Sequence, residues 1–392
     1  MPNQLRIPAT YMRGGTSKGL FFRLEDLPSS AQSAGPERDR LLQRIMGSPD
    51  PYGKQIDGMG GATSSTSKVA ILSPSQQPGH HVDYLFGQIG IDQPLVDWSG
   101  NCGNLTAAAA VFAINSGLID AQTIPENGEL EVRIWQQNIG KSILARVPMA
   151  DGQPLEQGDF YIDGVAFPGA KISLTFLHPG DSENALFPSG NPMDSLAVPT
   201  AINPRGRIDA TLINSGIAAV IIDARQINLS ATEQEQDLLN QPSRLQQLEI
   251  IRTQAAMQMG LISSAEQARE RQHTPKIIWL NHPQTYLASS GREINAAEID
   301  LCARALSMGR LHHAMMASAV VALGSAANIP GTLVAQLLGG TRDKLTLGHP
   351  SGSVSIGTSA SRNQQGHWCI DQATLERSAR VIMEGWVRVT IG

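Results

Sequence analysis

The sequence predicts an α/β (α+β) protein of two similar domains, each a curved, mostly antiparallel sheet around a central buried helix. Three observations support this prediction. The chain has 392 residues, too long for one ordinary core and suited to two domains of about 150 to 200 residues. Two Ala-rich segments are apolar on every side, as expected of helices inside a core. Two short motifs also recur, in the same order, about 200 residues further along.

The first Ala-rich segment, residues 107–114, follows a polar run that contains Cys102. Gly117 is well placed to end a helix there. Free N–H groups and the positive end of the dipole favour anions at a helix start. Cys102 therefore lies where a carboxylate could bind or a thiolate could form. The alternative is that Cys102 is a small core hydrophobe, the usual role of a lone cysteine.

Two glycine-rich and hydroxyl-rich runs precede this helix. A predicted strand over residues 7–11 leads into Gly14 and Gly15, which suit a tight loop whose backbone approaches a ligand. It is not a P-loop, because the spacing of that motif is absent and a strand follows. The second run, residues 58–67, leads into Lys68 at the start of an apolar strand. Lys68 is either a base held against a cleft or a solvated residue at a strand end.

The remaining segments alternate between the two predicted element types. We expect helices over residues 39–46, 230–261, 295–308 and 310–326, and a helix running into a last strand over 374–391. We expect strands over residues 20–22, 69–72, 81–90, 130–135, 141–147, 159–177, 211–223, 276–280 and 345–356. A Pro- and Gly-rich stretch, residues 179–204, marks the crossing between domains. The predicted domains are residues 1–184 with 376–392, and residues 185–375.

The recurring motifs indicate an internal duplication. Residues 10–15 resemble residues 211–216, and residues 101–107 resemble residues 307–314. In this alignment Met308 occupies the position of Cys102. Both buried helices would direct their N-termini at one cleft between the domains, a suitable place for a polyanion.

Composition excludes several classes of protein. The net charge of −5 argues against a nucleic-acid binder. The three cysteines form no CxxC pair, which excludes a zinc ribbon and suggests a reducing compartment. The first ten residues lack the apolar stretch of a secretory signal, and the uncharged run after Arg310 is broken well short of a membrane span. Acids and histidines do not cluster at metal-binding spacings, so no metal is expected.

Several of these runs together resemble one known family. They are residues 12–22, 58–68, 98–106, 273–276, 307–316, 348–352 and 377–389. The chain is similar to the diaminopimelate epimerase-like superfamily and, within it, to the 2-methylaconitate isomerase family of the methylcitrate route of propionate breakdown. The resemblance implies the epimerase-like fold and a cofactor-independent isomerase in which Lys68 and Cys102 are the acid/base pair. Met308 in place of a second thiol makes two-thiol racemisation unlikely.

The resemblance also implies a small tricarboxylate substrate, a cytoplasmic location and no nucleic-acid or membrane partner. It allows a homo-oligomer and points to an aconitase-like 2-methylcitrate dehydratase as functional partner. Lys68 would remove a proton next to the alkene of 2-methyl-trans-aconitate, with its pKa lowered by partial burial or by a cation such as Lys18. Cys102 would return a proton or stabilise the enolate, and which of the two residues is the base stays open on the sequence alone. The expected substrate-binding residues are Thr16, Ser17, Lys18, Ser64, Ser65, Asn101, Gly103, Asn104, Ser215, Gly216, Met308, Gly309 and Ser351.

Three other functions stay open on the sequence alone. An allylic isomerase or tautomerase of oxalomesaconate-type acids would use the same proton transfer on a different side group. An amino-acid epimerase or racemase would depend on the Cys102 thiol. A non-catalytic carboxylate binder would keep its ligand affinity without Lys68.

Overall fold

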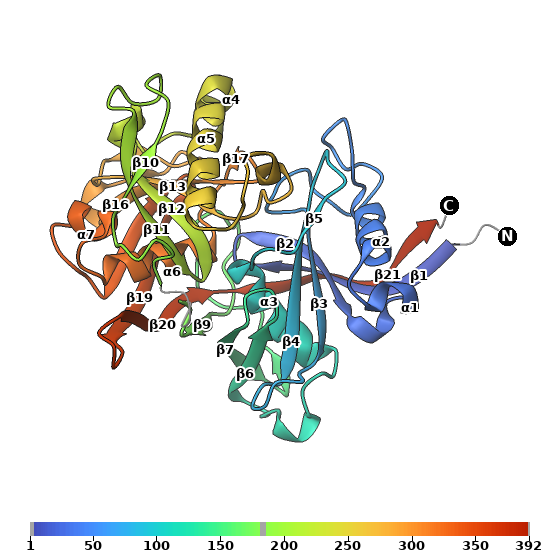
Figure 1. Ribbon diagram of the computed structural model, residues 1–392. Coiled ribbons are helices and arrows are strands. Elements are labelled where there is room, and N and C mark those ends of the chain that lie inside the picture. Colours follow the sequence, from blue (N-terminus) through green and yellow to red (C-terminus); the bar gives the residue numbers. More distant parts are fainter. Residues whose placement is uncertain (1–3, 181–185, 391–392) are drawn as a thin grey trace. The chain divides into compact units, whose positions relative to one another are not determined.

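The computed structural model describes residues 4–180 and 186–390 of the chain. These residues belong to two compact units, one of residues 1–174 with 376–392 and one of residues 175–375 (Figure 1). The chain leaves the first unit within β9 (Ile172–Leu177) and returns near the end of β20 (Trp368–Arg377). The domain boundary predicted at residue 184 lies outside the described residues.

The first unit is a mixed and mostly antiparallel sheet. Its strands follow the order β21, β1, β2, β3, β4, β6, β7, with parallel pairing only at β2–β3 and β4–β6 among these neighbours. Short strands β5 and β8 pair with β4 and β7. The strands are β1 (Gln4–Gly14), β2 (Ser17–Arg23), β3 (Lys68–Pro74), β4 (Val82–Ile89), β5 (Val96–Asp97), β6 (Gly128–Gln136), β7 (Lys141–Ala150), β8 (Gln153–Pro154) and β21 (Ala379–Thr390).

Helix α3 (Gly103–Asn115) is the buried element of the first unit. Every residue from its start to Ile114 is buried, and the helix contacts β1, β2, β3, β7 and β21 (Figure 1). The run of four alanines lets these strands approach closely. Gly117, with φ of +71°, terminates the helix, as its N–H donates to the Ile114 carbonyl. The other helices of this unit are α1 (Ser29–Gln32) and α2 (Pro36–Met46).

The second unit has the same kind of sheet. Its strands follow the order β10, β11, β12, β13, β16, β18, β19, β20, with parallel pairing only at β12–β13 and β16–β18 among these neighbours. The short β17 pairs with β16, and β14 pairs with β15. The strands are β10 (Asp194–Ala197), β11 (Arg207–Ser215), β12 (Ile217–Asp223), β13 (Lys276–Asn281), β14 (Tyr286–Leu287), β15 (Glu293–Ile294), β16 (Leu301–Ser307), β17 (Arg310–Leu311), β18 (Lys344–His349) and β19 (Gly352–Arg362).

Helix α6 (Ala317–Ala327) is the buried element of the second unit. All of its residues are buried, and it contacts β11, β12, β18 and β19. The other helices of this unit are α4 (Glu235–Leu239), α5 (Pro242–Gln258) and α7 (Leu333–Leu337). The predicted fold class is therefore confirmed: each unit is a mixed sheet with a buried helix.

The two units repeat one order of elements. A hairpin (β1–β2 or β11–β12) is followed by a strand parallel to its second arm (β3 or β13). An antiparallel neighbour (β4 or β16), a short strand (β5 or β17) and the buried helix come next. The N-cap residue of the helix lies five residues after the short strand in both units, at Cys102 and at Met316.

Four element predictions were wrong in whole or in part. Residues 301–307, predicted as helix, form β16, a strand buried along its whole length, whose apolar residues show no alternation. The helix predicted from residue 310 begins at Ala317, because β17 and its connection come first. The helix predicted from residue 374 is absent from the described residues: β20 and β21 cover this region, and β21 pairs with β1 from Gln4–Thr390 to Gly14–Ala379. Of residues 159–177, only β9 is a strand.

A glycine at the β11–β12 turn gives a test of this packing. Gly216 has φ of +68°, and a Cβ there would lie 2.7 Å from a methyl carbon of Val321 in α6. We predict that Gly216→Ala lowers the free energy of unfolding by about 2–5 kcal/mol, through left-handed backbone strain and overpacking. Gly291→Ala is the control, since Gly291 has φ of +83° and open space around it. Urea denaturation should show a clearly smaller loss for the control; equal losses would contradict this packing.

Candidate functional site

Lys68 is the first residue of β3, and its side chain is buried at 5% exposure. Its Nζ donates a hydrogen bond of 2.5 Å to Oε1 of Gln88, its cross-strand partner on β4. The Gln88 amide is itself oriented, because its Nε2 donates to the carbonyls of Ser64 and Ser67. The ring of Phe86 lies 4.9 Å from Nζ. The strand register therefore holds the amine in a defined position.

Burial lowers the pKa of Lys68 below the ordinary lysine value of 10.5, because desolvation penalises the ammonium form. Cys102 acts on the same amine electrostatically and opposes this shift. The sequence also suggested Lys18 as a cause. The Lys18 ammonium instead lies over the Tyr11 ring, 5.4 Å from its centroid, and burial accounts for the shift.

Cys102 is the N-cap residue of α3 and is 7% exposed. Its carbonyl accepts hydrogen bonds from the hydroxyls of Thr106, at 3.3 Å, and Tyr84, at 3.4 Å. Burial raises the pKa of Tyr84 well above its usual value, so the phenol stays a donor. The Cys102 Sγ lies 3.9 Å from the Ser17 hydroxyl. The thiol is thus held between the helix start and the β1–β2 loop.

The β1–β2 loop packs directly on the first turn of α3. Asn104 Nδ2 donates to the Thr16 hydroxyl at 3.1 Å, and Arg377 Nε donates to Asn104 Oδ1 at 2.8 Å. A Cβ at Gly15, which has φ of +50°, would lie 2.6 Å from Asn104 Oδ1, so only glycine fits. Burial lowers the pKa of Arg377 to about 10, which leaves it charged at neutral pH.

The predicted site residues of the first unit form one buried group. Hydrogen bonds connect Thr16 to Asn104 and Ser17 to Cys102, and the backbone N–H of Lys18 donates to the Ser65 carbonyl. Ser64 connects to Lys68 through Gln88. The members that are classed as buried are Thr16, Ser17, Ser64, Ser65, Lys68, Asn101, Cys102, Gly103 and Asn104.

The predicted site residues of the second unit lie in three places. Ser215 and Gly216 form the β11–β12 turn against α6, where the Ser215 hydroxyl is 2.8 Å from that of Ser325. Ser351 is buried in the β18–β19 turn, and its hydroxyl hydrogen-bonds to the His313 carbonyl at 2.5 Å. Met308 and Gly309, with φ of +53° and +73°, form the turn between β16 and β17.

The alignment of Met308 with Cys102 is corrected by the structure. Met308 lies in a strand-to-strand turn, not at a helix start. Met316, the N-cap residue of α6, is the counterpart of Cys102. The SMGRLHH run, residues 307–313, placed the alignment eight residues too early, because its glycine resembles the glycines of the polar loop before α3. A methionine still stands where the first unit has its thiol.

The sequence did not indicate three side chains of the first unit that position Lys68 or Asn104. Gln88 and Phe86 contact the Lys68 amine, and Arg377 orients Asn104. That Gln88 lies beside Lys68 could be inferred only from the pairing register of β3 and β4. Arg377 lies in a run that carried the family resemblance, but nothing in its sequence context indicated a buried guanidinium.

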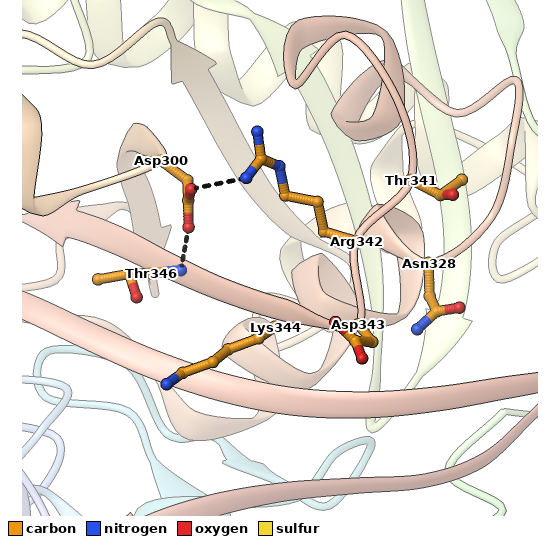
Figure 2. A pocket seen from close by; sticks show the side chains of 7 residues that line it. All are labelled: Asp300, Asn328, Thr341, Arg342, Asp343, Lys344 and Thr346. Atoms are coloured by element: carbon orange, nitrogen blue, oxygen red, sulfur yellow. Dashed lines mark hydrogen bonds and ion pairs between the residues drawn. The ribbon is translucent and has the colours of Figure 1, made fainter.

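We also searched the described residues for a metal site, a membrane-spanning helix and other pockets. No group of three or more His, Cys, Asp or Glu side chains among residues 4–180 and 186–390 could hold a metal ion. In the same residues, no helix has the length and apolar character to cross a membrane. A pocket of about 590 Å³ lies in the second unit, where Asp300 and Arg342 form an ion pair of 3.6 Å; Figure 2 shows its lining side chains. It contains none of the predicted site residues.

Comparison with known proteins decides the family. The PrpF protein family matches residues 4–390. The chain belongs to the PrpF protein family. It is 54% identical to a 2-methyl-aconitate isomerase of Cupriavidus necator over 98% of each chain. It is 35% identical to a 4-oxalomesaconate tautomerase of Pseudomonas putida, over 98% of this chain and 96% of that relative.

A solved structure agrees with this assignment to the PrpF family. The crystal structure of methylitaconate-delta-isomerase is similar at a TM-score of 0.76 and 34% identity. The match covers 100% of this chain and 98% of that one.

In this PrpF chain, the contact between Arg377 and Asn104 can be tested by stability. Arg377→Met leaves the buried Asn104 oxygen without its donor, and we predict a loss of about 1–3 kcal/mol in the free energy of unfolding. Arg388→Met removes an exposed arginine of the neighbouring β21 and should change stability by less than about 0.5 kcal/mol. Urea denaturation measures both. A loss for Arg377→Met no larger than for Arg388→Met would show that the contact has no structural importance.

Proposed function

We propose that this protein isomerises 2-methyl-trans-aconitate to 2-methyl-cis-aconitate without a cofactor. The observation that carries the proposal is the buried Lys68 amine, whose pKa is lowered by burial and which interacts electrostatically with Cys102. An amine with a lowered pKa is available as a neutral base at a pH nearer to neutrality. The similarity to a relative named 2-methyl-aconitate isomerase supports the choice of substrate.

In the proposed reaction one proton is removed from the substrate and another is returned to it. The neutral Lys68 amine removes a proton from the methylene carbon next to the alkene and becomes an ammonium. The electron pair spreads through the conjugated system to a carboxylate, and the former double bond loses bond order and rotates. The Cys102 thiol then returns a proton to the same carbon, and proton transfer from Lys68 to the thiolate restores both groups.

The first unit provides groups suited to a carboxylate. The Ser17 hydroxyl and the start of α3 at Gly103 lie beside Cys102, and the Thr16 hydroxyl accepts a hydrogen bond from Asn104 in the first turn of α3. Hydroxyl groups and helix-start amides donate hydrogen bonds to anions. We propose that these groups, with Lys18, Ser64, Ser65, Asn101 and Asn104, bind the substrate. Ser215, Gly216, Met308, Gly309 and Ser351 are proposed as contributions of the second unit.

A second candidate is tautomerisation of an oxalomesaconate-type acid. The relative from Pseudomonas putida, at 35% identity, favours it, and the proton transfer would be the same. The ratio of kcat/KM for the two substrates separates the candidates. Racemisation with two thiols is disfavoured because Met316 stands in the position of a second cysteine.

We further propose that the enzyme acts in propionate breakdown by the methylcitrate route, in the cytoplasm. An aconitase-like 2-methylcitrate dehydratase would supply the trans substrate. Three cysteines that form no disulfide, Cys102, Cys302 and Cys369, suit a reducing compartment. A homo-oligomer is compatible with this role.

The experiment follows 2-methyl-trans-aconitate in deuterated water by NMR, which reports isomerisation and deuterium uptake separately. We predict that Lys68→Met lowers both by about 10²–10⁴-fold, because no base removes the proton. Cys102→Ser should slow isomerisation more than exchange, since Lys68 still removes and returns a proton. Lys171→Met, an exposed lysine of the first unit, and Cys369→Ser, a thiol outside the site, are the matched controls.

Two results would overturn the proposal. Wild-type protein that neither isomerises the substrate nor incorporates solvent deuterium has no proton-transfer activity of this kind. If the Lys68→Met variant incorporated solvent deuterium into the substrate at the wild-type rate, another group would be the base. A non-catalytic carboxylate binder would keep its ligand affinity in this variant and show no turnover in the wild type.

A further inference from the structure

Asn138 lies in the turn between β6 and β7 and uses every hydrogen-bonding position of its side-chain amide. Its Oδ1 accepts hydrogen bonds from the backbone N–H of Phe86, at 2.8 Å, and from Nε2 of Gln136, at 2.6 Å. Its Nδ2 donates to the carbonyls of Phe86 and Trp98, both at 2.9 Å. Because a side-chain amide has two donor hydrogens and two acceptor lone pairs, these bonds saturate it and fix its orientation.

The Asn138 amide extends the pairing of β4 beyond the end of β6. The parallel register of these two strands ends at the pair Tyr84–Gln136, and the N–H of Gln137 still donates to the Tyr84 carbonyl at 3.0 Å. The chain then turns into β7, and the Asn138 side chain bonds to both the N–H and the carbonyl of Phe86. The amide therefore takes the place of a peptide group beside this part of β4.

Phe86 and Trp98, which Asn138 joins, belong to the segments that carry the amine and the thiol of the proposed site. The Phe86 ring lies 4.9 Å from Nζ of Lys68, and the side chain that accepts a hydrogen bond from Nζ is two residues further along β4. Trp98 lies four residues before Cys102, in the connection between β5 and α3. Asn138 thus connects the strand that orients the amine with the loop that leads to the thiol.

The loop that contains Trp98 also packs directly on β4. A Cβ at Gly87 would lie 3.0 Å from the Trp98 ring, so a larger residue there would displace the ring. The indole N–H donates to a carboxylate of α2 at 3.0 Å, and the Tyr84 hydroxyl donates to the Cys102 carbonyl at 3.4 Å. These contacts hold the ring and the far end of the loop, and the bond from Asn138 holds the Trp98 carbonyl between them.

We propose that Asn138 is a positioning residue that holds the Lys68 amine and the Cys102 thiol at the separation required for proton transfer between them. The inference rests on the proposed function, in which Cys102 returns a proton and Lys68 then restores the thiol. All of these groups lie in the first unit. A misplacement of about 1 Å can slow such a step by about 10²-fold.

The titration midpoint of Lys68 tests this separation without turnover, because Cys102 acts electrostatically to raise the pKa of the amine. Cys102→Ser should therefore lower the midpoint, which ¹³C NMR of lysine-labelled protein measures. We predict that the same replacement lowers it less than about half as much in the Asn138→Ala background, since the interaction weakens with distance. Asn127→Ala is the matched control: Asn127 is exposed and directly precedes β6, and its replacement should leave the effect of Cys102→Ser unchanged.

Steady-state kinetics provide a second readout. We predict that Asn138→Ala lowers kcat for isomerisation of 2-methyl-trans-aconitate at least about tenfold and leaves KM within about twofold of the wild type, because the change affects proton transfer and not binding. A purely structural role of Asn138 would lower the free energy of unfolding but leave kcat per folded molecule unchanged.

Three results would overturn the proposal. The first is a Lys68 midpoint that does not respond to Cys102→Ser in the wild type. The second is an effect of Cys102→Ser that is undiminished in folded Asn138→Ala protein. The third is a kcat of that variant within about twofold of the wild type. Circular dichroism checks the fold, and Asn138→Ser, judged by the same criteria, replaces Asn138→Ala if the latter does not fold. Wild-type protein that isomerises nothing refutes the proposed function, whereas the titration still decides whether Asn138 sets the separation.

Discussion

Lys68 places an amine where water is largely excluded, and the local structure of the first unit offsets the cost of doing so. Transferring an ammonium from water into a protein interior costs several kcal/mol unless polar groups receive it. Gln88 provides an oxygen at 2.5 Å, and the carbonyls of Ser64 and Ser67 hold that amide in the required orientation. The hydroxyl-rich run before β3 is therefore a support for the lysine, because its backbone fixes the lysine's partner.

The position of the thiol depends on a second constraint, close packing at the start of α3. The β1–β2 loop lies against this helix so tightly that a Cβ at Gly14 would lie 2.6 Å from the Asn104 carbonyl oxygen. Asn104 in turn is fixed by Thr16 and by the buried Arg377. Glycines in the loop and alanines in the helix thus bring Ser17 beside Cys102. The same arrangement recurs in the second unit, where Gly216 lies against Val321 of α6.

The two units share one order of strands but differ in the side chains at equivalent positions. The helix N-cap is Cys102 in one unit and Met316 in the other. The lysine that begins β3 or β13 contacts Gln88 in one unit and His273 with Ser307 in the other. A two-thiol mechanism would need a cysteine where the second unit has Met316, so our proposal does not include one.

Much of the fold could be predicted from the sequence, for physical reasons that apply element by element. Helix α3 was evident because a long Ala-rich run that is apolar on every side is typical of a helix inside a core. Strand β16 was missed because it is buried on both faces and therefore shows no alternation, and because it contains Arg304. That arginine is fully buried, with Nε donating to the Glu233 carbonyl at 2.7 Å, a contact 71 residues away in sequence. Pairing at such distance leaves no local signal.

The site, like the fold, could be predicted only in part. Lys68 and Cys102 could be chosen from their local context, glycines and hydroxyls before a strand or a helix. Gln88 could not, because its place beside Lys68 follows from the pairing of β3 with β4. Met308 was aligned with Cys102 because the motif similarity ignored the short strand β17.

The most direct test of Lys68 as the base is its own pKa, measured by ¹³C NMR titration of its Cε in lysine-labelled protein. Loss of one signal in Lys68→Arg assigns the resonance. We predict a midpoint below 10.5, and a higher midpoint in Gln88→Glu, where a carboxylate beside Nζ favours the ammonium form. A wild-type midpoint at or above 10.5 would contradict this role, because burial would then not provide a neutral base.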